Sequence, residues 1–218
     1  MSNRNNPDDT DVSPPNPIGE GLLDRRTVVL SGEISPKSVA EAGRQMMALQ
    51  MRSPDKINLI IDSGGGATYA ALHLCDLMRT VITSHIRGIA LGDCGSAATF
   101  IMLHCDERLT TPFSQFLIHS GTRSKITIPI NQTTTENLEQ LLKDTRATEE
   151  MVIELYRNKL TPTAWKKSKP SKARQIQYVQ QLIARGDQRF DNWLTAEEAV
   201  EVGLVTKIVR DKLDIFSD

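Results

Sequence analysis

The chain has 218 residues, a length that suits one α/β domain with a sizeable core or such a domain with appendages. Its 26 Lys and Arg residues nearly balance its 27 Asp and Glu residues, so neither nucleic acid nor an anionic membrane is expected as a main partner. The three cysteines are odd in number and lack metal-ligand spacing, which suits reduced thiols in a cytosolic compartment better than a disulfide scaffold.

The N-terminal segment is expected to be an arm without stable packing. Residues 1–20 are polar and contain four prolines, and the first nine residues lack the apolar core of a signal peptide. The most apolar stretch, at 97–103, is far too short to cross a bilayer. We therefore expect a flexible arm over 1–20, order from near Leu22, and a cytoplasmic protein without membrane contact.

Strands and helices are predicted to alternate through the central part of the chain. The first strand is expected at 27–30, and Ser35 begins a helix that reaches about Met51 and buries Val39, Ala42, Met46 and Leu49. Further strands are predicted at 57–62, 86–91 and 116–118, with helices at 68–81 and 95–105. This alternation implies right-handed crossovers and an α/β fold with a mainly parallel sheet covered on both faces.

The C-terminal half is dominated by a predicted long amphipathic helix at 131–159. Its apolar residues recur at steps of three and four: Leu138, Leu141, Leu142, Met151, Val152, Leu155 and Tyr156. Such a helix can project and pack against a copy of itself, or it can simply cover the core, and periodicity alone leaves both open. A basic segment at 160–175, helices at 175–184 and 196–202, and a last strand at 204–209 complete the prediction.

Two glycine-rich turns follow neighbouring predicted strands and precede helices. The first contains Gly64, Gly65 and Gly66, and the second places Ser96 after Gly95. A serine at such a turn can expose its hydroxyl beside backbone N–H groups that face a bound oxygen. An ordinary N-cap serine would have the same local sequence, and for this turn alone that alternative is favoured. The glycine turn shifts the balance toward a nucleophile, because it adds a second source of amides at the same sheet edge.

A base and an acid are needed beside a nucleophilic serine. His119 ends the predicted strand at 116–118 and is the histidine best placed for this role, although a histidine bonded to nearby backbone is the ordinary alternative. Spacing cannot choose the acid, because catalytic triads occur in several chain orders. The aspartates that remain by location are Asp62, Asp76, Asp93, Asp106, Asp187 and Asp191.

From about residue 22 to 209 the chain resembles the ClpP family, the proteolytic subunits of the ATP-dependent Clp protease. Residues 61–66 (Ile-Asp-Ser-Gly-Gly-Gly) are similar to the family's Ile-Asn-Ser-Pro-Gly-Gly turn, and 92–96 (Gly-Asp-Cys-Gly-Ser) to its Gly-x-Ala-Ala-Ser. Residues 117–119 (Leu-Ile-His) match Met-Ile-His, and 191–199 resemble Asp-Arg-Phe-Leu-Ser-Ala-x-Glu-Ala. Their common order and spacing make the resemblance specific.

No cofactor is expected, and no metal, since the pair His104 and Cys105 has no second cluster with ligand spacing. The resemblance implies roles for individual residues. Ser96 would be the nucleophile, His119 the general base and Asp191 the residue that orients His119, with Asp187 as the alternative acid. The amides of Gly66 and Ala97 would form the oxyanion hole. Ile126 and Ile128 would lie on the strand that binds an extended peptide along its edge.

The resemblance also implies an architecture and an activity. The fold would be that of ClpP and the crotonases, with repeated β-β-α units, a mainly parallel sheet and a protruding handle helix. We expect the arm at 1–20, a peptidase domain at 21–211 with its handle at about 121–160 and an insertion at about 161–186, and a tail at 212–218.

The expected function is a serine endopeptidase that cuts unfolded polypeptides inside a homo-oligomer of stacked, heptameric rings, with an AAA+ Clp unfoldase as a candidate partner. A phage-type protease that matures capsid or scaffold proteins and a catalytically silent ring subunit are the alternatives. Three replacements depart from the family pattern: Gly64 stands for proline, Gly95 for alanine and Ala97 for methionine.

Overall fold

The computed structural model describes residues 17–119, 134–186 and 193–211. Within these residues the sheet has six strands. Five follow the order β1-β2-β3-β4-β6, and β5 pairs with the last residues of β3, past the part of β3 that pairs with β4. All of the strand pairs are parallel, which confirms the α/β class and the mainly parallel sheet. The strands are β1 Thr27–Ile34, β2 Ile57–Gly66, β3 Ile86–Gly95, β4 Glu107–Thr110, β5 Gln115–Leu117 and β6 Lys207–Ile208.

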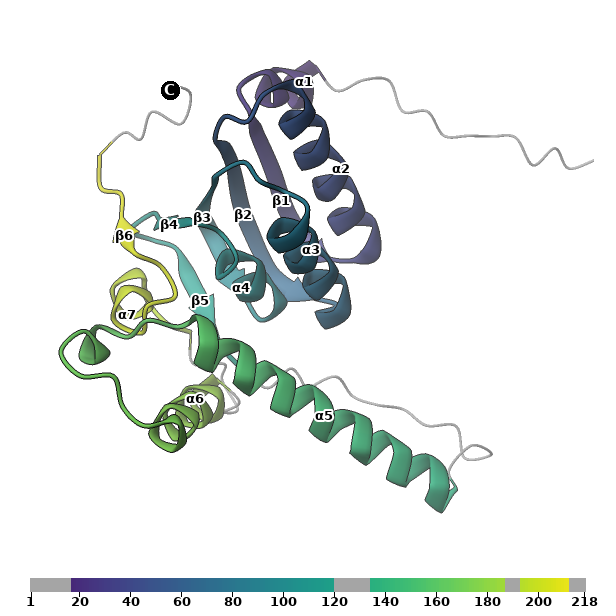
Figure 1. Cartoon of the computed structure of the whole chain (residues 1–218), viewed down its shortest axis with the longest axis vertical. Coiled ribbons are helices and arrows are strands. Elements are labelled where there is room, and N and C mark those ends of the chain that lie inside the picture. Colours follow the sequence, from purple (N-terminus) through teal and green to yellow (C-terminus); the bar gives the residue numbers. More distant parts are fainter. Residues whose placement is uncertain (1–16, 120–133, 187–192, 212–218) are drawn as a thin grey trace, which may run out of the picture.

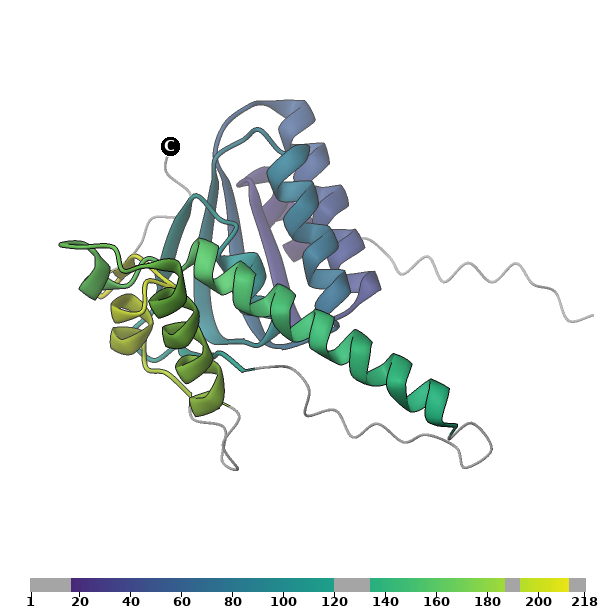
Figure 2. The same cartoon turned by 60° about the horizontal axis from the view of Figure 1, so that its bottom comes forward.

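Helices cover one face of the sheet formed by β1, β2 and β3, as Figures 1 and 2 show for α2, α3 and α4. On the other face, Val29 of β1 and Leu91 of β3 remain 41% and 49% exposed. The expectation of a sheet covered on both faces is therefore wrong for this part of the chain. The described helices are α1 Pro17–Asp24, α2 Pro36–Arg52, α3 Thr68–Thr80, α4 Ala97–Met102, α5 Thr135–Lys159, α6 Lys172–Gly186 and α7 Ala196–Glu201, with a 3₁₀ turn at Thr163–Trp165.

The sequence accounts for the position of α2 at both its start and its buried face. The Ser35 hydroxyl accepts a hydrogen bond from the Ser38 N–H at 3.2 Å, and Pro36 occupies the first helical position. The four apolar residues predicted to form its inner face are all buried, namely Val39, Ala42, Met46 and Leu49. Burying a side chain the size of Met46 or Leu49 contributes about 1.5–3 kcal/mol.

Several predicted boundaries differ from the observed ones. Helix α1 begins at Pro17, inside the arm predicted over 1–20, because proline fits the first turn of a helix. Strands β2 and β3 continue through the predicted turns to Gly66 and Gly95, and α4 is correspondingly shorter than predicted. The short strand β4 was not predicted, because the sequence Glu-Arg-Leu-Thr has too few apolar residues to signal one.

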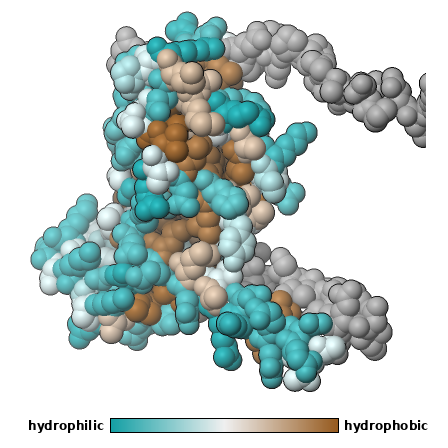
Figure 3. Space-filling view, turned by 45° about the vertical axis from the view of Figure 1, so that its right-hand side comes forward, coloured by the Kyte–Doolittle hydropathy of each residue, from teal (hydrophilic) through white to brown (hydrophobic). Residues whose placement is uncertain are grey.

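Helix α5 has one packed end and one projecting end. Val152 and Tyr156, near its C-terminus, are buried, whereas Leu138 and Leu142 are 39% and 57% exposed. With 25 residues the helix is about 37 Å long. Figures 1 and 2 show its N-terminal part extending away from the sheet, and Figure 3 shows apolar atoms among the mainly hydrophilic ones of that part.

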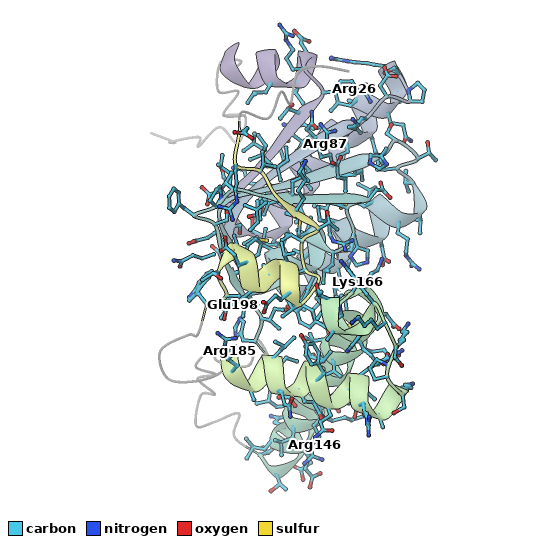
Figure 4. All side chains as sticks on the ribbon, turned by 90° about the vertical axis from the view of Figure 1, so that its left-hand side faces the viewer. Arg26, Arg87, Arg146, Lys166, Arg185 and Glu198 are labelled. Atoms are coloured by element: carbon cyan, nitrogen blue, oxygen red, sulfur yellow. The ribbon has the colours of Figure 1, made fainter. Side chains whose placement is uncertain are left out.

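The basic segment after α5 continues into α6, which packs against the C-terminal part of α5. Val179 and Ile183 of α6 are buried in the common core. The Arg185 guanidinium of α6 donates to the Glu198 carboxylate of α7 at 2.8 Å, and Figure 4 shows the two side chains pointing toward one another. Among the described helices, none is long and apolar enough to span a membrane.

Candidate active site

Ser96 has a backbone conformation that side-chain-bearing residues rarely adopt. It lies between β3 and α4 with φ 50° and ψ −125°. Among the described residues other than glycine, only Arg26 shares a positive φ. Conformations of this kind cost of order 1–3 kcal/mol and persist only where the surroundings impose them. A sharp, strained strand-to-helix turn is also how α/β hydrolases expose a nucleophilic serine.

The Ser96 side chain does not act as a helix cap. Ser96 occupies the N-cap position of α4, but its hydroxyl accepts no hydrogen bond from the amides of the helix. Instead its carbonyl accepts from the Thr99 N–H at 3.0 Å. The alternative that Ser96 is an ordinary N-cap serine is therefore wrong, and the residue is half-buried.

Ser96 and His119 follow the ends of neighbouring strands. Strands β3 and β5 pair in parallel with Gly95 opposite Leu117. The Ser96 N–H donates to the Leu117 carbonyl at 2.7 Å, and half-buried His119 lies two residues beyond Leu117. The structure thus brings the candidate nucleophile and the candidate base to one carboxyl edge of the sheet, where open α/β sheets bind ligands.

The first glycine turn lies directly against Ser96. An ideal Cβ on Gly65 would come within 2.6 Å of the Ser96 Cβ and 3.1 Å of the Ala97 nitrogen. Gly65 has φ 110° and Gly66 has φ 149°, so both positions favour glycine. The two predicted turns are therefore in contact, as expected for neighbouring parallel strands.

Gly66 is the last residue of β2 and follows the glycine that lies against Ser96. The next amide, that of Ala67, donates to the Ile34 carbonyl of β1 at 2.8 Å. Gly66 itself lies close to the same strand, since an ideal Cβ on it would come within 2.3 Å of the Ile34 carbonyl oxygen. The Ala97 amide is the first of α4 and therefore has no acceptor within its helix. Gly66 and Ala97, the two candidate oxyanion donors, thus lie at the two turns that meet at Ser96.

The described chain next to the candidate acid also reaches this edge. Leu194 forms an antiparallel bridge with Phe116 of β5, with N–O distances of 2.9 and 2.7 Å. An ideal Cβ on Gly95 would lie 2.9 Å from the Trp193 ring, so glycine at this position leaves room for a large aromatic side chain. Asp191 and Asp187 lie outside the described residues, as do Ile126 and Ile128.

Of the other aspartates considered, two lie elsewhere. The Asp106 carboxylate accepts from the Ile86 N–H at 2.8 Å, at the opposite edge of the sheet, and Asp76 pairs with Arg79 on α3 at 3.1 Å. Asp62 and Asp93 do lie at the carboxyl edge, where the Asp93 N–H donates to Asp62 at 3.1 Å, but both are exposed. Burial raises the pKa of the Cys94 thiol, which keeps this neighbour of Ser96 protonated and unreactive.

Sequence reasoning missed two polar residues beneath Ser96. The Thr99 hydroxyl donates to the Ser96 carbonyl at 2.6 Å and lies 2.7 Å from the Tyr156 hydroxyl of α5. Tyr156 was expected only as an apolar contact of the long helix. The three-residue spacing of Ser96 and Thr99 is a detectable signal for the first contact. The contact between Thr99 and Tyr156 joins residues 57 positions apart, so no local sequence pattern predicts it.

Comparisons with known proteins show the family to which the chain belongs. A family model described as Clp protease matches residues 16–212. The chain is 28% identical to the "ATP-dependent Clp protease proteolytic subunit 2" of Treponema denticola, over 98% of this chain and 92% of that protein. It is 27% identical to the proteolytic subunit 1 of Protochlamydia amoebophila, over 92% and 88% of the two chains, and 26% identical to subunit 3 of Streptomyces coelicolor, over 91% and 82%.

Proposed function

The chain belongs to the Clp protease family, and from this premise we propose that it is a serine endopeptidase whose nucleophile is Ser96. The observation that carries the proposal is the backbone of Ser96, whose φ of 50° presents a hydroxyl that caps no helix. Strain at a residue whose side chain makes no capping hydrogen bond to the helix that follows it is hard to explain by folding alone. The position of His119 beyond the adjacent strand supports the same proposal.

In the proposed reaction, Ser96 Oγ attacks the carbonyl carbon of a peptide bond while His119 accepts the hydroxyl proton. The bond from carbon to nitrogen then breaks, His119 returns the proton to the leaving amine, and an ester of Ser96 remains. A water molecule that gives its proton to His119 hydrolyses this ester and restores the serine. The oxygen of each tetrahedral intermediate accepts hydrogen bonds from the N–H groups of Gly66 and Ala97.

Asp191 is proposed to orient His119. In the sequence it precedes Trp193 by two residues, and the Trp193 ring lies against Gly95, the residue before Ser96. Asp187 is four residues further from this anchored point. Ile126 and Ile128 are proposed to bind an extended stretch of substrate through backbone hydrogen bonds, which would make the enzyme tolerant of sequence.

The protein is further proposed to work as a homo-oligomer of stacked, heptameric rings that encloses its active sites. Exposed apolar residues on two surfaces support this assembly. The first surface is the projecting part of α5, with Leu138 and Leu142. The second is the face of the β1-β2-β3 sheet opposite the helices, with Val29 and Leu91. An AAA+ Clp ATPase is the proposed supplier of unfolded polypeptide, since the Treponema relative is named as ATP-dependent. Sedimentation of the wild-type chain as a monomer at working concentrations would overturn the assembly.

The peptidase proposal is tested by hydrolysis of an unstructured fluorogenic peptide. Ser96→Ala should lower kcat by about 10³-fold or more without changing sedimentation. Asp191→Asn should lower kcat by about 10²-fold or more, whereas Asp187→Asn should stay close to wild type. Unchanged hydrolysis by Ser96→Ala would exclude the mechanism, and a larger effect at Asp187 would move the acid. A wild type that assembles but hydrolyses nothing would indicate a silent subunit.

A further inference from the structure

The geometry points to Tyr156 as a positioning residue that fixes the oxyanion-hole amide of Ala97 through Thr99. This inference rests on the proposed function, because it assigns a role to two residues beneath the proposed nucleophile. Neither residue reaches the carboxyl edge where the substrate would bind. Both lie beneath the turn at Ser96 and are fully buried, each with 0% exposure.

Counting protons gives the direction of each hydrogen bond in the series that links Tyr156, Thr99 and the Ser96 carbonyl. The Ser96 carbonyl can only accept, so the single hydroxyl proton of Thr99 is donated to it, over 2.6 Å. The contact of 2.7 Å between Thr99 and Tyr156 must then use the tyrosine proton, with Thr99 as acceptor. Burial raises the pKa of Tyr156, so the phenol keeps that proton throughout the accessible pH range. The two bonds polarise one another in the same direction.

The Ser96 carbonyl and the Ala97 N–H belong to one peptide group. Peptide groups are planar, and no cis peptide bond occurs among the described residues, so this carbonyl and this N–H point in opposite directions. Two donors from Thr99, its N–H at 3.0 Å and its hydroxyl, hold the carbonyl toward the helix. The Ala97 N–H is thereby aimed away from the helix, toward the Gly65 turn.

Tyr156 is held in place by packing, so it can serve as the fixed end of this hydrogen-bonded series. Its ring meets Phe100 of α4 edge-on, with ring centroids 5.5 Å apart and an angle of 66° between the planes. Val152, one turn earlier on α5, is buried in the same core. The strained backbone of Ser96, with ψ −125°, persists only where its surroundings impose it. The bonds from Thr99, backed by Tyr156, are what we infer to impose it.

A phenylalanine at position 156 removes the hydroxyl and keeps the ring. Tyr156→Phe should lower kcat for the fluorogenic peptide by about five- to tenfold, with KM nearly unchanged. The affinity for a peptide boronic acid, whose tetrahedral adduct uses the oxyanion hole, should fall by a similar factor. Tyr178→Phe is the matched control, because its half-buried ring packs on Trp165 and no hydrogen bond between described residues uses its hydroxyl.

Titration of reactive serines with a fluorophosphonate separates positioning from stability. A variant that merely unfolds in part has fewer titratable sites, but each remaining site keeps the wild-type kcat. The inference requires full titration and a lower kcat per site. If Tyr156→Phe matches Tyr178→Phe in kcat per site and in boronic acid affinity, the inference is wrong while the peptidase proposal stands. Absence of any titratable serine in the wild type would instead defeat the peptidase proposal itself.

Substitutions at Thr99 provide a second route should Tyr156→Phe fail to fold. Thr99→Val removes the hydroxyl at nearly constant volume and should lower kcat by at least as much as Tyr156→Phe. Thr99→Ser restores the donor and should recover most of that loss. Since both residues act on one carbonyl, the double variant Tyr156→Phe/Thr99→Val should be no slower than Thr99→Val alone. Equal activity of the valine and serine variants, or strictly additive effects, would overturn the inference.

Discussion

At the junction of β2 with α3 the chain turns on glycines, whereas at the junction of β3 with α4 it turns on a serine. The first junction places its positive φ values at Gly65 and Gly66 and reaches the helix through Ala67 in an ordinary extended conformation, with φ −64° and ψ 109°. The second junction uses a negative φ at Gly95 and places the positive φ of 50° at Ser96. The two junctions look alike in sequence but differ in which residue carries the unusual backbone.

This difference shows how the fold separates two tasks. Glycine turns freely and lets another backbone approach closely, which is what the first junction does against Ser96 and Ala97. A side chain at the turn must instead be held in place, and Ser96 is held by its bonds to Leu117 and Thr99. The strain therefore lies at the residue whose hydroxyl is proposed to react, and the surrounding hydrogen bonds offset it.

The largest effect on this pair of junctions is expected from a methyl group inserted between them. In Gly65→Ala the new Cβ would lie 2.6 Å from the Ser96 Cβ and 2.8 Å from the Gly95 carbonyl, at a position with φ 110°. We expect a loss of about 10²-fold or more in kcat/KM and a loss of about 1–3 kcal/mol in stability.

Gly64→Ala is the matched control, because an ideal Cβ there meets nothing within 4 Å and φ is not positive. Its kcat/KM and thermal unfolding should stay near those of the wild type. Equal effects of the two substitutions would show that the close approach of the junctions does not matter for activity.

A smaller effect on stability is expected when Ser96 or Ala67, the residues that precede α4 and α3, is replaced by glycine. The effect should have opposite signs at the two junctions. Ser96→Gly should be more stable than the equally inactive Ser96→Ala by about 0.5–1 kcal/mol, because glycine relieves a positive φ that alanine cannot. Ala67→Gly should be less stable than the wild type by about the same amount, since φ is ordinary there and only the unfolded chain gains freedom.

Thermal unfolding of the four proteins at one subunit concentration measures this contrast. A Ser96→Gly variant less stable than Ser96→Ala would mean that Ser96 is not strained. The comparison also separates strain from activity, because both Ser96 variants lack the hydroxyl.

Much of the fold could be predicted because its signals are local. The apolar face of α2 and the order of β2, α3, β3 and α4 follow from periodicity and capping. The placement of Ser96 and His119 at one edge of the sheet follows from parallel strands, once those strands are identified. The projection of α5 was one of two alternatives that its periodicity left open, because its apolar pattern is longer than is needed to cover the core.

The remainder depends on contacts that no local pattern encodes. Strand β4 is short and charged, and it is stabilised by pairing with β3 and β6. The absence of helices from the second face of the β1-β2-β3 sheet could not be predicted. The apolar pattern of a strand is the same whether a helix or another surface covers it. The bond between Thr99 and Tyr156 requires α5 to return onto α4, and the φ of Ser96 is imposed by its neighbours rather than by serine.

The most direct test of the central claim, that the strained Ser96 is an activated nucleophile, is fluorophosphonate labelling of the assembled wild-type protein with mass-spectrometric mapping of the adduct. The account predicts one adduct per chain, on Ser96, and none on the Ser96→Ala variant. An adduct on another residue, or no adduct in a protein that hydrolyses peptides, would contradict it.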